Sequence, residues 1–165
     1  MASERFVAAL TEQIAREFAA AHQYVAIGNY YSAETYPQLT SFFYDQAEEE
    51  REHAMKMVNY LIDMGIQPDI GGVESPKGGF GDHVEPIRLA LEQERQVTIK
   101  ISELFEIARE TRDYASEQFM QWFVQEQVEE EAAMGDLLAV AERTVSVPML
   151  LEEYLARDKP GARPE

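Results

Sequence analysis

Each long helical pattern in the sequence carries carboxylates in the middle of its apolar face. Residues three and four apart share one face of a helix, and following the chain in these steps gives long apolar rows with one polar break in each. The breaks consist of Glu17, of Glu50 with His53, of Glu94, and of Gln127 with Glu130. A buried carboxylate without a counter-charge is very costly, and no Lys or Arg lies in these rows. Divalent metal ions are the economical way to neutralise them.

The two halves of the chain repeat this arrangement at a spacing of 77 residues (94 − 17). The shift maps Glu17 onto Glu94, Glu49 onto Glu126, Glu50 onto Gln127 and His53 onto Glu130. Di-iron carboxylate bundles take one Glu from each of two helices and Glu-x-x-His from each of the other two. Because Gln127 and Glu130 replace the second Glu-x-x-His, we expect one metal bound by carboxylates and His53, and another by carboxylates only. Glu50 has two oxygens with which to bridge them, and Fe(II), Mn(II) or Zn(II) suits such ligands.

Four long helices with one long connection must position these residues. Helices are predicted at about 3–33, 37–64, 83–109 and 113–143, with a short fifth helix at about 148–156 and a polar tail at 157–165. No segment alternates with a period of two over strand length, so the fold class is all-α. The Gly- and Pro-rich segment 66–82 can return along a whole helix, which makes the second and third helices parallel. An up-down-up-down bundle with a floppy loop is the less favoured alternative.

Composition narrows the function further. The chain of 165 residues fits a single domain, 1–165, with the four-helix bundle at about 3–143. A net charge of −17 argues against nucleic acid and anionic membranes as partners, and favours cations. The lack of cysteine excludes thiol catalysis, disulfides and Cys-based metal sites. No apolar run approaches the roughly 20 residues of a membrane span, and charged residues run through the N-terminal segment, so we expect a cytoplasmic protein.

The residues around the polar breaks also carry a family resemblance. The stretches EQIAREFAAAHQYVAI, FFYDQAEEEREHA, LALEQERQVT and FMQWFVQEQVEEE make the chain similar to bacterial non-haem ferritins over nearly its whole length. The resemblance implies a ferritin-like bundle with a short fifth helix. It also implies a homo-oligomeric hollow cage of 24 subunits, which oxidises Fe(II) with dioxygen or peroxide and stores Fe(III) as mineral.

The resemblance assigns a role to each residue of the predicted centre. It implies a first iron on Glu17, Glu50 and His53. It implies a second iron on Glu50, Glu94 and Glu130, with Gln127 beside it and Tyr24 as a nearby hydrogen-bonding or redox tyrosine. It also implies a third iron site on Glu49, Glu126, Glu129 and Glu130. Bacterioferritins carry a haem-binding methionine directly after the bridging glutamate, where this chain has Arg51, and a histidine where it has Glu130. We therefore expect no haem.

Simpler interpretations stand beside these. The central acids could be protonated or solvated, Tyr24 could be a plain core aromatic, and the Glu49, Glu126 and Glu129 set could be a solvated acidic face. His22 and His83 are expected at the surface. Two other functions also fit: a shell that buffers metal without catalysis, and a di-metal peroxidase resembling rubrerythrin, a family that usually adds a Cys₄ iron module for which this chain has no cysteine.

Overall fold

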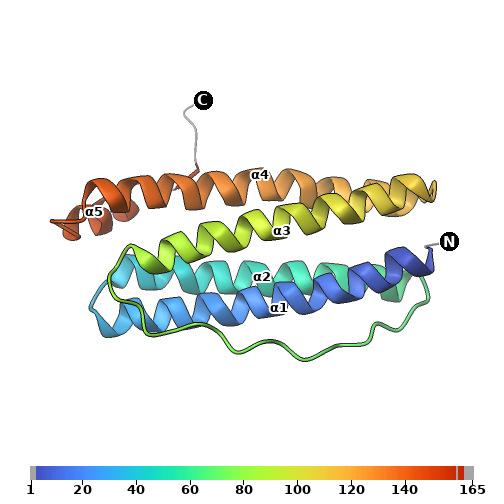
Figure 1. Cartoon of the computed structure of the whole chain (residues 1–165), viewed down its shortest axis with the longest axis horizontal. Coiled ribbons are helices and arrows are strands. Elements are labelled where there is room, and N and C mark those ends of the chain that lie inside the picture. Colours follow the sequence, from blue (N-terminus) through green and yellow to red (C-terminus); the bar gives the residue numbers. More distant parts are fainter. Residues whose placement is uncertain (1–2, 159, 162–165) are drawn as a thin grey trace.

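A computed structural model of the chain describes residues 3–158 and 160–161. It contains five helices, and the described residues form no strand (Figure 1). The helices are α1 (Glu4–Ala33), α2 (Pro37–Asp63), α3 (Glu85–Glu110), α4 (Tyr114–Arg143) and α5 (Met149–Arg157). The all-α prediction is confirmed, with helix ends within two residues of the expected positions. The predicted polar tail lies mostly outside the described residues.

Local chemistry explains where the helices begin and end. The hydroxyl of Ser3 accepts the backbone N–H of Phe6 at the start of α1, and Asp113 accepts that of Ser116 at the start of α4; both are side-chain N-caps. The third helix begins two residues later than predicted. There one carboxylate oxygen of Asp82 accepts the N–H groups of Val84 and Glu85, both at 2.8 Å, and so holds this segment in a turn ahead of α3.

The helices form two antiparallel hairpins, α1–α2 and α3–α4, joined by a long crossover (Figure 1). The connection runs back along the bundle, so α2 and α3 are parallel and the up-down-up-down alternative is wrong. Gln23 on α1 holds the crossover at Lys77. Its side-chain N–H donates to the Lys77 carbonyl and its oxygen accepts the Lys77 N–H, both at 2.8 Å.

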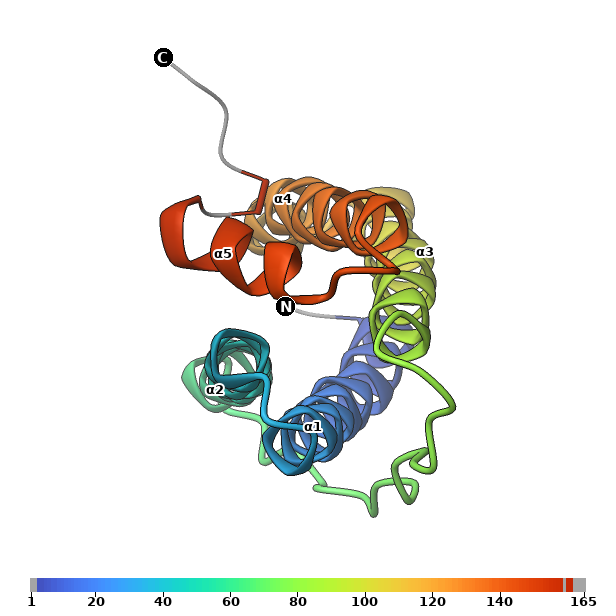
Figure 2. The ribbon, with the colours of Figure 1, turned by 90° about the vertical axis from the view of Figure 1, so that its left-hand side faces the viewer.

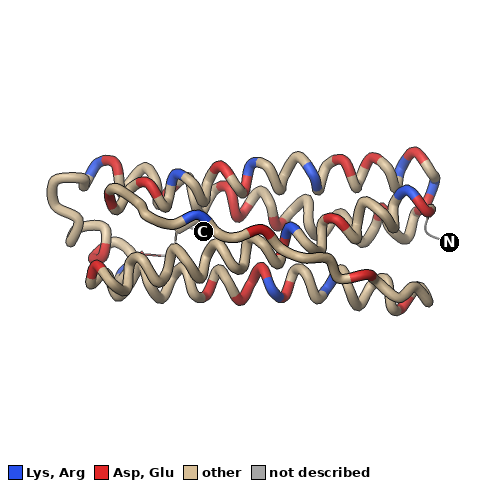
Figure 3. The backbone as a smooth tube through the Cα atoms, turned by 60° about the horizontal axis from the view of Figure 1, so that its bottom comes forward, with Lys and Arg blue, Asp and Glu red and all other residues tan. Residues whose placement is uncertain are grey.

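The four predicted faces point into the bundle and bury their apolar residues. One core cluster contains Phe6, Leu10, Met57, Ile101 and Phe123, and the other contains Tyr31, Phe43, Ile87, Met134 and Leu137. The buried carboxylates lie between these two clusters in the sequence of every helix. Other acidic residues are spread along the whole length of the bundle (Figure 3).

The bundle is less tightly closed on one side. Viewed end-on, α1 lies against α3, whereas α2 and α4 are further apart and α5 reaches both of them (Figure 2). Glu152 on α5 is buried, and its carboxylate accepts the N–H groups of Gln38 and Leu39 at the start of α2, at 2.8 and 2.9 Å. The short fifth helix is thus fastened to α2 by a charged cap. In the described part of the chain, no helix is both long and apolar enough to cross a membrane.

The expectation for His83 is wrong. Its side chain is 8% exposed, and its ring lies beside that of Tyr36, 6.0 Å between centroids. Its carbonyl accepts the hydroxyl of Tyr31 at 2.6 Å. The chain turns inward here because the next residue, Val84, enters the core. His22 is at the surface, as expected.

Candidate metal centre

Two groups of potential ligands meet halfway along the bundle. Glu17 of α1 and Glu50 and His53 of α2 are all buried, and each offers a ligand atom within 4.8 Å of the others. His53 also belongs to a second group, with Glu126 and Glu130 of α4, that meets the same limit. His53 Nδ1 lies 3.6 Å from Glu50 Oε2, and its Nε2 lies 4.0 Å from Glu126 Oε1. The imidazole therefore lies between the carboxylates of α2 and those of α4.

Glu94 of α3 faces the same region and already has two donors. The Tyr24 hydroxyl donates to Glu94 Oε1, and the side-chain amide of Gln127 donates to Glu94 Oε2 at 3.1 Å. The same amide lies 3.2 Å from the Glu94 carbonyl and 3.3 Å from the hydroxyl of Thr98. Tyr24 therefore packs in the core and also donates a hydrogen bond to Glu94.

Burial raises the pKa of three of the central carboxyls, those of Glu50, Glu94 and Glu130. The pKa of Glu50 lies well above its usual value because of burial and then the charges of Glu94 and Glu17. Burial, followed by the charge of Glu94, raises the pKa of Glu130 to about 9. Burial also raises the pKa of Glu94, to about 7, although the hydrogen bonds from Tyr24 and Gln127 lower it.

The pKa of His53 is shifted in the opposite direction, below its usual value. Burial lowers its pKa, against the raising effect of the Glu17 charge. Neutral imidazole is the form that binds metal, and ligand carboxyls release their protons when an ion binds. A divalent cation at this place would exchange with the protons of the carboxyls and would find His53 ready to coordinate.

The nearby basic side chains form their contacts elsewhere and do not offer a positive charge to the central glutamates. Arg16 pairs with Glu12 and Arg51 with Glu48 on the outside of their helices, and Lys56 lies over the ring of Trp122, 3.5 Å from its centre. In the portion of the chain that the structure describes, no Lys or Arg forms an ion pair with the four central glutamates, Glu17, Glu50, Glu94 and Glu130. The simpler interpretation of solvated acids does not fit carboxyls that are at most 5% exposed.

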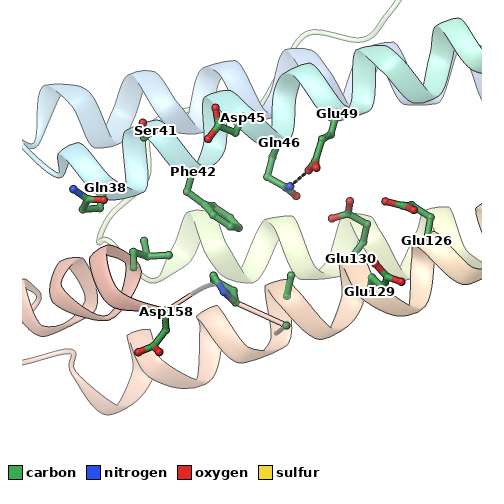
Figure 4. Close-up of a pocket in the computed structure, with 14 residues that line it drawn as sticks. Gln38, Ser41, Phe42, Asp45, Gln46, Glu49, Glu126, Glu129, Glu130 and Asp158 are labelled. Carbon is green, nitrogen blue, oxygen red and sulfur yellow. Dashed lines mark hydrogen bonds between the residues drawn. The ribbon is translucent and has the colours of Figure 1, made fainter. Parts of the chain in front are cut away.

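The proposed third set lies beside this centre in a pocket of about 810 Å³ between α2 and α4 (Figure 4). Glu49, Glu126, Glu129 and Glu130 line it, and the amide of Gln46 donates to Glu49. Phe42 and Leu155 form an apolar part of its wall, and residues 158, 160 and 161 also border it. The structure thus brings the predicted acids to one opening, of which Glu130 also belongs to the buried centre.

Two contacts of the centre were not anticipated from the sequence. Trp122 rests against His53, with ring centroids 5.4 Å apart. Gln13, one turn before Glu17, is completely buried and donates its side-chain N–H to Glu17 Oε1 at 2.8 Å. A signal for Gln13 was present, because an amide four residues before a buried acid lies on the same helix face.

Comparisons with known proteins identify the family to which the chain belongs. Residues 7–144 match the family described as the ferritin-like domain. Ferritin BfrB of Mycobacterium tuberculosis is 46% identical over 154 residues, 93% of this chain and 85% of that protein. A bacterial non-heme ferritin of Staphylococcus aureus is 42% identical over 132 residues, 80% of each chain. The open pore ferritin of Archaeoglobus fulgidus superposes with a TM-score of 0.92 at 30% identity, covering 96% of this chain and 100% of that one. The chain therefore belongs to the ferritin family.

Proposed function

We propose that this ferritin oxidises Fe(II) at the buried centre and passes Fe(III) on for storage. Iron storage is supported by the family, and the catalytic step rests on one observation. Four helices bring buried carboxyls and one imidazole together, and no Lys or Arg among the described residues forms an ion pair with these carboxyls. The first ferrous ion would bind Glu17, Glu50 and His53, and the second Glu50, Glu94 and Glu130.

The side chains of the centre would handle protons while iron supplies electrons. Two Fe(II) ions lose one electron each, and dioxygen takes up these two electrons and two protons to become hydrogen peroxide. Hydrogen peroxide can take two electrons from two further Fe(II) ions, together with two protons, and become two water molecules. The raised pKa values of Glu94 and Glu130 mean that iron binding releases protons close to the reacting atoms. Tyr24 would orient Glu94, and Gln127 would hold the other oxygen of the same carboxylate.

The pocket between α2 and α4 offers an onward route for the product. We infer that Glu49, Glu126 and Glu129, with Glu130, form a third iron site at its opening. The observation that supports this role is the sharing of Glu130 between the buried centre and the pocket. Iron leaving the centre would then pass directly from buried to accessible carboxylates.

Storage requires an assembled shell, and we propose a homo-oligomer of 24 subunits. The structural relatives are ferritins described by their pores, which are features of a shell. Negative-stain microscopy and size-exclusion chromatography test the proposal: a hollow sphere is expected. A monomer or dimer at micromolar concentration would remove the storage function.

Fe(II) added without oxygen, followed by dioxygen, tests the catalytic step. The unmodified protein should consume oxygen rapidly with a transient blue absorbance. The pair Glu94→Ala with His53→Ala should abolish this, because it removes a ligand from each proposed ion. The matched control is Glu92→Ala with His22→Ala, which changes the same residue types at exposed positions and should oxidise iron normally.

The outcomes separate the candidate functions. Iron binding without oxygen consumption would indicate a shell that buffers metal, for which the replacement of Glu-x-x-His by Gln127 and Glu130 is the supporting observation. Oxidation that needs peroxide and is not followed by mineral growth would indicate a peroxidase. Undiminished oxidation in the double variant at positions 53 and 94 would reject the assignment of the centre.

A further inference from the structure

The side-chain amide of Gln13 donates a hydrogen bond to one carboxylate oxygen of Glu17. Gln13 lies one turn before Glu17 on α1, and the two residues face the same way because they are four apart. Its Nε2 donates to Glu17 Oε1 at 2.8 Å, and neither side chain is exposed to solvent by more than 1%. A hydrogen bond between two buried side chains is stronger than the same bond in water, because the surroundings have a low dielectric constant.

The orientation of that amide is determined by its other neighbour. Arg16 Nη1 donates to Gln13 Oε1 at 3.4 Å, while Arg16 Nη2 holds Glu12 at 3.1 Å near the surface. The amide oxygen therefore faces a cation and the NH₂ group faces a carboxylate. The reversed orientation would place oxygen against oxygen on one side and NH₂ against guanidinium on the other.

This contact leaves the two oxygens of Glu17 in different states. Oε1 accepts the amide of Gln13, whereas Oε2 is buried and has no amide donor among the described residues. The other group hydrogen-bonded to the Glu17 carboxylate is the carboxyl of Glu50, a proposed ligand of the same ion. Glu17 also belongs to the group whose ligand atoms lie within 4.8 Å of one another. A neutral amide orients the carboxylate without bringing a positive charge that would compete with a metal ion for it.

In the second half of the chain, the equivalent glutamate, Glu94, accepts a hydrogen bond from a glutamine at a different position. The 77-residue shift maps Glu17 onto Glu94 but Gln13 onto Ala90, which has no donor. The amide that holds Glu94 comes instead from Gln127 on α4. Both equivalent glutamates are therefore held by a glutamine amide, although the two donors are not equivalent in the repeat.

We propose that Gln13 is a positioning residue, whose amide holds Glu17 so that Oε2 alone binds the first metal ion. The inference rests on the proposed function, since it assumes that Glu17 is a ligand. Outer partners of metal ligands typically change metal affinity 10- to 100-fold when they are removed. Loss of this one should free Glu17 to rotate and to bind through both oxygens.

Anaerobic Co(II) titration of the assembled protein, followed by the visible d–d absorption, tests the proposal. Gln13→Met keeps the length and bulk of the side chain but removes the donor. We expect about tenfold weaker Co(II) binding, together with a weaker band at saturation because a second oxygen raises the coordination number. A residue that only fills space would leave the band unchanged in this variant.

Two further variants complete the test. Gln96→Met removes an amide that donates to Glu92, four residues away on the exposed face of α3, and should behave as the unmodified protein. Arg16→Met removes the group that orients the Gln13 amide at a half-exposed position, and should cause a smaller loss in the same direction. Unmodified protein without a Co(II) band would reject the proposed function. Normal affinity and band shape in both Gln13→Met and Arg16→Met would reject the role of Gln13 alone.

Discussion

Replacing Glu130 by glutamine should stabilise the metal-free protein. Burial raises the pKa of Glu130 from about 4.5 to about 9 in the folded chain. The unfolded chain therefore ionises first, and the stability contributed by the protonated carboxyl is complete below pH ~4.5 and is lost progressively as the pH rises towards 9. Glutamine resembles the protonated carboxyl in shape and remains neutral at every pH, so Glu130→Gln avoids this loss.

The size of the effect follows from the two pKa values. One pKa unit corresponds to about 1.4 kcal/mol, so unfolding at pH 7 gains about 3 kcal/mol per subunit from the ionisation of Glu130. At pH 5 the same reasoning gives less than about 1 kcal/mol. The advantage of Glu130→Gln should accordingly grow from pH 5 to pH 8.

Urea denaturation followed by circular dichroism, on chelator-treated protein at one fixed concentration, measures this difference. The control is Glu106→Gln, which neutralises an exposed acid on α3 and should leave the urea midpoint unchanged at pH 5 and at pH 8. Addition of Co(II) should reverse the order at pH 5, where the difference is less than about 1 kcal/mol, because an ion that binds only the folded state stabilises it by about 2.7 kcal/mol at one hundred times its Kd, and Glu130→Gln has lost a proposed ligand. A metal-free Glu130→Gln protein no more stable than the unmodified one at pH 8 would refute the burial argument.

Two further predictions concern the surroundings of the centre. Tyr24→Phe removes the hydroxyl that donates to Glu94, so the pKa of that carboxyl should rise above about 7. The lost bond is worth roughly 1.5–3 kcal/mol, and proton release measured on anaerobic Fe(II) binding should increase at pH 7. Gly28→Ala places a Cβ 2.5 Å from a ring carbon of Tyr44 and should cost about 1–3 kcal/mol of stability. Gly135→Ala meets nothing within 4 Å and should gain up to about 1 kcal/mol; equal urea midpoints for the two alanine variants would contradict the packing argument.

The helices and their polar breaks could be predicted from the sequence because both depend on local rules. A period near 3.6 residues identifies the face that each helix buries, and caps such as Ser3 and Asp113 mark the starts of α1 and α4. The length of the 66–82 segment was enough to distinguish a crossover from a short hairpin. The convergence of Glu17 and Glu94 on one layer followed from their equivalent places in the repeat.

Other features depend on how the helices are placed relative to one another, and periodicity contains no such information. It gave no reason to bury His83, which turns inward behind Val84, or to place Trp122 against His53. Only the packed bundle shows which oxygen of Glu94 faces Tyr24 and which faces Gln127. The sequence alone determined that acids share the buried faces. The tertiary structure decided the hydrogen bonds of Glu94 and the raised pKa values of the buried acids, because both depend on distances of a few ångströms between side chains from different helices.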